Sequence, residues 1–224
     1  MEESLNIKEK ENQSKNKKGK EKREYKLQEG SIKIILLGEV GVGKTSLINA
    51  YLDKNFDPGE ISTDVPAIMN SNINSTEYKT FNIVLWDTAG QEKYRSITQS
   101  FYHDSQIVIL VYSITDKKSF EEIKKYWYQS IAESIGKDAI FGLAANKSDL
   151  YDKEEVPKKE GVEYAKEIGA TFRETSAKEL REDLKKFINE LIEQLLQNKN
   201  LIQKGEKIIL KNPEKNKKKC CFFL

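Results

Sequence analysis

The sequence predicts an α/β fold in which a doubly wound, mostly parallel six-stranded sheet carries helices on both faces. Short apolar runs of strand length recur along the chain, and stretches with apolar residues three or four positions apart lie between them. Such alternation of strands and helices is typical of a parallel sheet whose ligands bind at the carboxyl ends of the strands.

The expected strands are short and apolar, as buried parallel strands are. The first begins at Ser31 and runs to Leu37, where a glycine follows. The other five runs lie at residues 67–74, 81–86, 107–114, 140–145 and 171–175, and the first of these is expected at an edge of the sheet.

The expected helices show an apolar face with helical spacing. In the last of them Leu184, Phe187, Ile188 and Leu191 fall on one side, which predicts packing against the sheet. The helical stretches lie at residues 44–52, 120–134, 158–168 and 182–196.

The two ends of the chain differ in charge from the middle. Residues 1–30 contain nine Lys or Arg and seven Glu with no aliphatic run, so we expect disorder there. Residues 199–224 contain eight Lys against two Glu and are expected to form a flexible basic tail. One acidic domain, with a net charge of about −6, is therefore expected over residues 31–198.

The overall composition excludes several classes of protein. The pI of about 8.2 averages unlike segments, so it does not indicate a nucleic-acid partner, and a membrane surface fits the basic tail better. No run approaches the ~20 apolar residues of a membrane span, and the charged N-terminus is unlike a signal peptide. The two cysteines are adjacent, which excludes a disulfide framework and a zinc quartet.

The first strand leads into a glycine-rich loop that predicts a phosphate site. Residues 38–45 read GEVGVGKT and match GxxxxGK[ST] between a strand and a helix. Backbone N–H groups of such a loop face phosphate oxygens, Lys44 is expected to reach the β- and γ-phosphates, and the Thr45 hydroxyl to bind Mg²⁺. A plain glycine turn is the alternative, but it does not require the Lys-Thr pair. The predicted nucleotide-binding residues here are Gly38, Glu39, Val40, Gly41, Val42, Gly43, Lys44, Thr45 and Ser46.

A second motif, DTAGQE at residues 87–92, predicts the metal and the hydrolytic residues. Asp87 follows a strand, so its carboxylate can face the metal across the loop. The Gly90 N–H can approach a γ-phosphate, and Gln91 can orient an attacking water, which with Lys44 gives the expected catalytic pair. A helix-capping role for Asp87 is the alternative.

The next motifs predict guanine rather than adenine. Asp149 can accept two parallel hydrogen bonds from guanine N1 and N2, a pair that adenine does not offer. Asn146 is expected at the opposite edge of the base and the Lys147 stem over its face. The segment Ser176, Ala177 and Lys178 follows another strand, where the Ala177 N–H can reach guanine O6 and Lys178 can cover the ring.

These four motifs, in this order, resemble the small GTPases of the Ras superfamily. Residues 86–98, WDTAGQEKYRSIT, together with VYSIT at 111–115, resemble the Rab branch. The resemblance covers residues 31–196 and implies a slow GTPase that uses Mg²⁺ and is ordered by GTP. It also implies effectors, an exchange factor, a GTPase-activating protein and a dissociation inhibitor. Aligned with the family, Thr63 would contact Mg²⁺ and the γ-phosphate, and Phe56 would flank guanine.

Three departures from the family pattern stand out. DVPA at 64–67 replaces the usual sequence after Thr63, and residues 101–105 differ and include the sole histidine, His103, expected at the surface. Val40 occupies a place where Rab-like loops have serine and Ras-like loops glycine. Val40 either crowds the attacking water or an arginine finger, which can contribute ~10³- to 10⁵-fold in rate, or is a tolerated variant.

The C-terminus predicts a lipid anchor. KNKKK at 215–219 leads into Cys220 and Cys221 and the ending FFL. Cys221 fits a geranylgeranyl C-a-a-X motif, and the Cys pair resembles Rab ends with two prenyl groups. One lipid binds marginally, so a second lipid or the lysines, at ~1 kcal/mol each, are needed.

The expected location is the cytoplasmic face of an intracellular membrane, with a soluble cytosolic pool. The resemblance implies a function in vesicle targeting and fusion. Two alternatives remain open: a Ras-like signalling switch at the plasma membrane, and a GTP-locked scaffold that hardly hydrolyses GTP.

Overall fold

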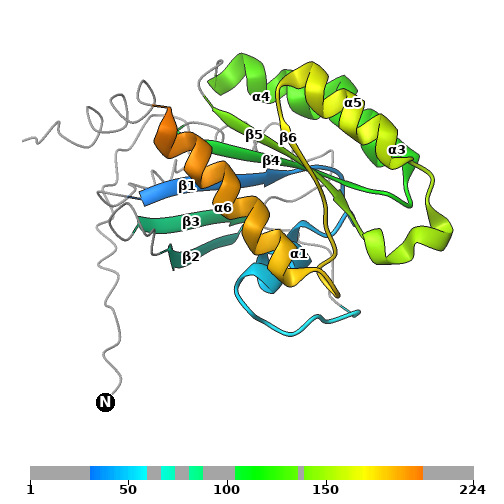
Figure 1. Cartoon of the computed structure of the whole chain (residues 1–224), viewed down its shortest axis with the longest axis horizontal. Helices are drawn as coiled ribbons and strands as arrows, with labels where there is room; N and C mark the ends of the chain where they lie inside the picture. The colour runs from blue at the N-terminus through cyan, green and yellow to red at the C-terminus, as the bar shows by residue number, and fades with distance from the viewer. Residues whose placement is uncertain (1–30, 60–66, 74–80, 88–103, 136–138, 199–224) are drawn as a thin grey trace, which may run out of the picture.

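A single sheet lies at the centre of the computed structural model, which describes residues 31–59, 67–73, 81–87, 104–135 and 139–198 (Figure 1). Within those ranges six strands pair in the order β2-β3-β1-β4-β5-β6, and all are parallel except β2, which runs antiparallel to β3. The predicted six-stranded, mostly parallel sheet with an edge strand is therefore confirmed. The strands are β1 Ser31–Leu37, β2 Ala67–Ile73, β3 Phe81–Asp87, β4 Ile107–Ser113, β5 Ile140–Asn146 and β6 Thr171–Glu174.

Strand β1 occupies the middle of the sheet. It pairs with β3 on one side, where Ile34 faces Leu85, and with β4 on the other, where Ile34 faces Ile107. Every residue of β1 is buried. Its carboxyl end therefore lies where the strand order reverses, which is where open α/β sheets bind ligands.

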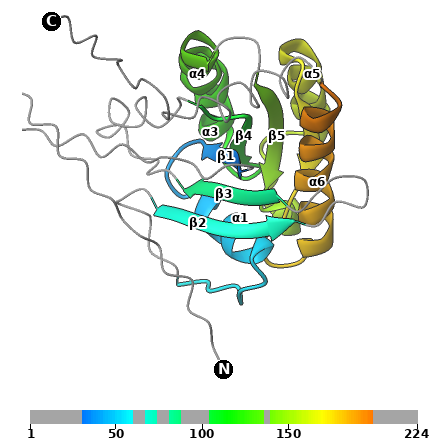
Figure 2. The same ribbon diagram turned by 90° about the vertical axis from the view of Figure 1, so that its left-hand side faces the viewer.

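Helices cover both faces of the sheet, as predicted (Figure 2). Helices α1 and α6 pack on one face, and α3, the π-helical turn η2, α4 and α5 pack on the other. The bounds are α1 Lys44–Tyr51, α3 Lys117–Glu122, η2 Ile123–Trp127, α4 Tyr128–Ile135, α5 Lys158–Ile168 and α6 Arg181–Gln197, with a 3₁₀ turn η3 at Ser148–Lys153.

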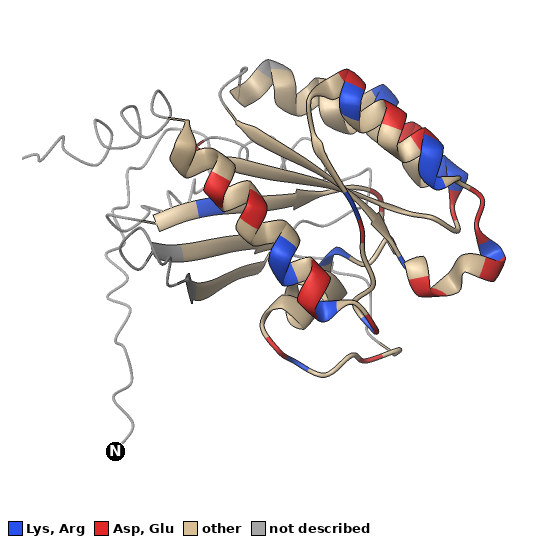
Figure 3. Ribbon diagram, in the orientation of Figure 1, with Lys and Arg blue, Asp and Glu red and all other residues tan. Residues whose placement is uncertain are grey.

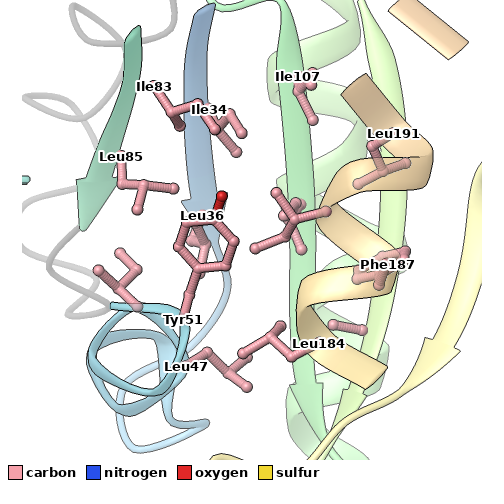
Figure 4. Packing of buried hydrophobic residues seen from close by; sticks show 14 of the residues in the cluster. Ile34, Leu36, Leu47, Tyr51, Ile83, Leu85, Ile107, Leu184, Phe187 and Leu191 are labelled. Carbon is pink, nitrogen blue, oxygen red and sulfur yellow. The ribbon is translucent and has the colours of Figure 1, made fainter. Parts of the chain in front are cut away.

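Two apolar cores result, because successive strand side chains point to opposite faces. Ile34 and Leu36 of β1 join the core under α1 and α6, where they meet Leu47, Leu184 and Phe187 (Figure 4). Ile35 and Leu37 of β1 point to the other face and join the core under α3, η2, α4 and α5. Most of the charged residues among those described lie on the helices and loops, and few lie on the strands (Figure 3).

The helix predicted over residues 120–134 differs from expectation in two ways. It begins earlier, at Lys117, because the Asp116 carboxylate accepts a hydrogen bond from the Ser119 N–H and caps the first turn. It also contains the π-helical turn η2, and both end residues of that turn, Ile123 and Trp127, are fully buried. The periodicity of apolar residues predicts a regular helix and does not reveal where packing against the sheet produces a π-helical turn. None of the helices in the described ranges is long and apolar enough to cross a membrane.

Candidate functional site

The loop between β1 and α1 forms a tight backbone cradle. A Cβ added at Gly38 would lie 2.1 Å from the Val111 carbonyl oxygen, and one added at Gly43 would lie 2.5 Å from the Asn146 side-chain nitrogen. Gly43 also has a positive φ of 94°, which disfavours any other residue. Glycines at these two positions thus let the loop close against β4 and β5 beside the N-terminus of α1.

Lys44 lies inside this cradle. Its side chain is buried, and Nζ donates hydrogen bonds to the carbonyl oxygens of Gly38 at 3.0 Å and Glu39 at 2.9 Å. Burial lowers the pKa of Lys44 to about 8, and the carboxylates of Asp87 and Glu39 oppose that shift. The buried cation is therefore satisfied by the loop's own carbonyl groups, which phosphate oxygens can replace.

Thr45 and Asp87 bring two hard oxygen ligands together next to Lys44. Asp87 is the last residue of β3 and pairs in register with Leu36 of β1. Thr45 Oγ1 donates to Asp87 Oδ2 at 2.6 Å, and Asp87 is buried. Hydroxyl and carboxylate oxygens are the protein ligands that Mg²⁺ takes beside nucleotide phosphates, so this pair fits the ion.

Asn146 ends β5 and links two loops. Its Nδ2 donates to the Val42 carbonyl oxygen at 2.7 Å, and its Oδ1 accepts from Thr175 Oγ1 at 3.3 Å. The side chain is almost fully buried. Asn146 therefore joins the cradle to the end of β6, a function that the sequence did not predict, while its contact with a base stays a prediction.

Asp149 is oriented by the loop after β6. Ser176 Oγ donates to Asp149 Oδ1 at 2.7 Å and accepts from the backbone N–H groups of Lys178 and Glu179. Lys147 has a left-handed φ of 62°, an uncommon conformation for a residue with a side chain. The motifs 146–149 and 176–178, which are far apart in the sequence, thus form one unit.

The remaining predicted residues differ in their exposure. Val40 and Phe56 are exposed at 42% and 40%, whereas the side chains of Val42 and Ala177 are buried. Gly41 is exposed and Ser46 is half-buried. Thr63, Gly90, Gln91, Cys220 and Cys221 lie outside the described residues, as do His103 and the two chain ends.

The sequence reasoning missed one side chain at the cradle. Trp127 Nε1 donates to the Glu39 carboxylate at 2.9 Å. The sequence gives no signal of this contact, because a tryptophan on the apolar face of a helix is expected to pack in the hydrophobic core.

Comparison with known proteins agrees with this geometry. The model of the Ras family matches residues 33–197. Over 174 aligned residues the chain is 33% identical to the Ras-related protein RABC1 of Arabidopsis thaliana. The aligned region covers 77% of this chain and 81% of that protein. The chain therefore belongs to the Ras family and is a Rab-like small GTPase, a switch that binds GTP and GDP, hydrolyses GTP and acts through regulators and effectors.

Proposed function

We propose that this GTPase controls vesicle targeting and fusion within the endomembrane system. The similarity to a Rab-related protein along 81% of its length carries the proposal, and the Rab-type residues 86–98 support it. GTP orders the segments around Thr63 and Gly90, effectors bind that state, and hydrolysis releases them. An exchange factor, a GTPase-activating protein and a dissociation inhibitor are the expected regulators.

In the proposed nucleotide complex, Lys44 exchanges its two carbonyl partners for oxygens of the β- and γ-phosphates. Thr45, Asp87 and Thr63 would hold Mg²⁺, which neutralises charge on those phosphates when bound. Gln91 orients the attacking water. Asp149, already held by Ser176 at 2.7 Å, accepts hydrogen bonds from guanine N1 and N2.

The proposed location is the cytoplasmic face of an intracellular membrane, with a soluble cytosolic pool. Prenyl groups on Cys221, or on both Cys220 and Cys221, supply the apolar anchor, and the lysines at 215–219 add attraction to an anionic leaflet.

Imaging of the full chain with an N-terminal tag tests both location and anchor. We expect labelling of internal membranes that becomes diffuse in the Cys220→Ser/Cys221→Ser variant. The single variants separate the two lipid schemes: a C-a-a-X anchor is lost only with Cys221→Ser, whereas a paired anchor is weakened by either change. Labelling confined to the plasma membrane would favour the Ras-like alternative, and unchanged membrane labelling of the double variant would contradict the anchor.

The exposure of Val40 in the cradle supports a second candidate, a GTP-locked scaffold. Its branched side chain would crowd the attacking water or an arginine finger beside the γ-phosphate. Single-turnover hydrolysis, with and without an activating protein, should then be at least about tenfold faster in Val40→Ser, while Val40→Thr, which keeps the branch, stays slow. Equal rates in all three proteins would reject this candidate.

A further inference from the structure

The π-helical turn η2 ends at a side chain that reaches the phosphate cradle. Trp127 is fully buried, and its Nε1 donates to the carboxylate of Glu39, the second residue of the cradle, at 2.9 Å. π-helical turns inside α-helices are rare and are frequent at functional sites. This contact joins the helical layer over one face of the sheet directly to the nucleotide loop.

The hydrogen bond between Trp127 and Glu39 is costly to break. An indole N–H can only donate, and a buried donor that loses its acceptor destabilises the folded protein. A carboxylate acceptor makes the bond charge-assisted and therefore stronger than a neutral one. Glu39 is thus attached to Trp127 through its side chain and to Lys44 through its backbone oxygen, at 2.9 Å.

Of these two hydrogen bonds of Glu39, we expect only the one to Trp127 to remain when a nucleotide binds. Lys44 turns its ammonium to the phosphates in the proposed complex, whereas the Glu39 carboxylate can remain on Trp127. We propose that Trp127 is a positioning residue that fixes the cradle backbone through Glu39 and thereby slows the release of nucleotides that carry a β-phosphate. The inference rests on the proposed seat of the phosphates in the cradle.

The test compares GDP with GMP, which lacks the β-phosphate, on the full chain in excess Mg²⁺. Affinities come from competition against a fluorescent GDP analogue, and dissociation rates from its displacement. We expect Trp127→Phe and Glu39→Ala each to speed GDP release about tenfold, equivalent to about 1.4 kcal/mol, with GMP affinity unchanged. The double variant should release GDP no faster than either single variant, and Glu39→Gln, which keeps an acceptor, should retain most of the wild-type rate.

Tyr112→Phe is the matched control for Trp127→Phe. Tyr112 lies in the same core, and its buried hydroxyl has no hydrogen-bond partner among the described residues, so its loss should leave GDP release unchanged. Additive effects of the two changes, or equal weakening of GDP and GMP, would overturn the inference. Lys44→Met separates this failure from that of the proposed site, because unchanged GDP affinity in that variant would show that the phosphates bind elsewhere.

Discussion

At the proposed base end of the nucleotide site, the hydrogen bonds of Asn146 and Asp149 join protein groups to one another and need not be broken by a ligand. At the proposed phosphate end, Lys44 and Thr45 bond to groups of the same loop and to Asp87, and a nucleotide bound there with Mg²⁺ would exchange those bonds. The base end is therefore preorganised, whereas the phosphate end has alternative partners in its two states. This difference suits a switch, because the proposed guanine contacts would stay constant while the contacts at the phosphate end would change with the bound nucleotide.

The largest expected effect is at the phosphate end, from Lys44→Met. Loss of the buried cation that meets the phosphates should lower GDP and GTP affinity about 10²- to 10³-fold. The stability of the nucleotide-free protein should not fall, since the change removes a buried charge whose pKa burial has lowered to about 8. Calorimetric titration and urea denaturation of nucleotide-free protein measure the two quantities.

Lys33→Met is the control for this result, because Lys33 is also a buried lysine but lies near the start of β1, whereas the cradle follows the end of that strand. Its nucleotide affinity should match the wild type. A Lys44→Met protein that binds GDP within a few fold of wild type would break the comparison between the two ends.

A smaller effect, of a different kind, is expected at the base end from Asn146→Ala. The Val42 carbonyl and the Thr175 hydroxyl would lose their partner, so the free energy of unfolding should fall by about 2 kcal/mol even without nucleotide. Urea denaturation of nucleotide-free protein measures this. Ser134→Ala, which removes a hydroxyl bonded within α4, should change stability by less than about 0.5 kcal/mol.

If Asn146→Ala weakened nucleotide binding but left the nucleotide-free protein as stable as wild type, the base end would not be preorganised. The hydrogen bonds at both ends of the site would then depend on the bound nucleotide, and the two ends would not differ.

The smallest expected effect comes from Lys33→Met, and it depends on pH. Burial lowers the pKa of Lys33 to about 8, partly offset by Asp104, while the unfolded value is 10.5. The unfolded chain thus binds more protons between these values, and wild-type stability should rise with pH across this window. Below pH 8 the full penalty remains, so Lys33→Met should be more stable there.

The expected gain at pH 7 is about 1 kcal/mol, because solvent screening and the loss of the contact between Nζ and the Trp86 ring, at 4.3 Å, reduce it. Urea denaturation at pH 7 and pH 10 should show the gain shrinking at the higher pH. The exposed Lys159→Met should show no such trend, and a gain that grew with pH would contradict the sign.

Much of the fold and of the candidate site could be predicted from short stretches of the sequence. The strands β1, β3, β4 and β5 were recognisable as apolar runs, whereas β2 and β6 gave a weaker pattern because they contain several polar residues. The cradle was predictable because a strand, a glycine loop and the Lys-Thr pair are adjacent in the chain. The bonds that brace the site were not. Trp127 and Glu39 are 88 positions apart, and Asn146 and Val42 are 104 apart, so only the folded packing brings them together. The π-helical turn was missed for the same reason.

The antiparallel direction of β2 has a consequence for how the molecule transmits its state. In that register Ala67, where the chain enters β2, lies opposite Asp87, where the chain leaves β3. Had β2 run parallel to β3, its first residue would lie at the far end of the strand, about 20 Å away for seven residues. The residues at which the chain enters β2 and leaves β3 are therefore neighbours beside the proposed metal site, so a ligand bound there would be close to both points of the chain at once.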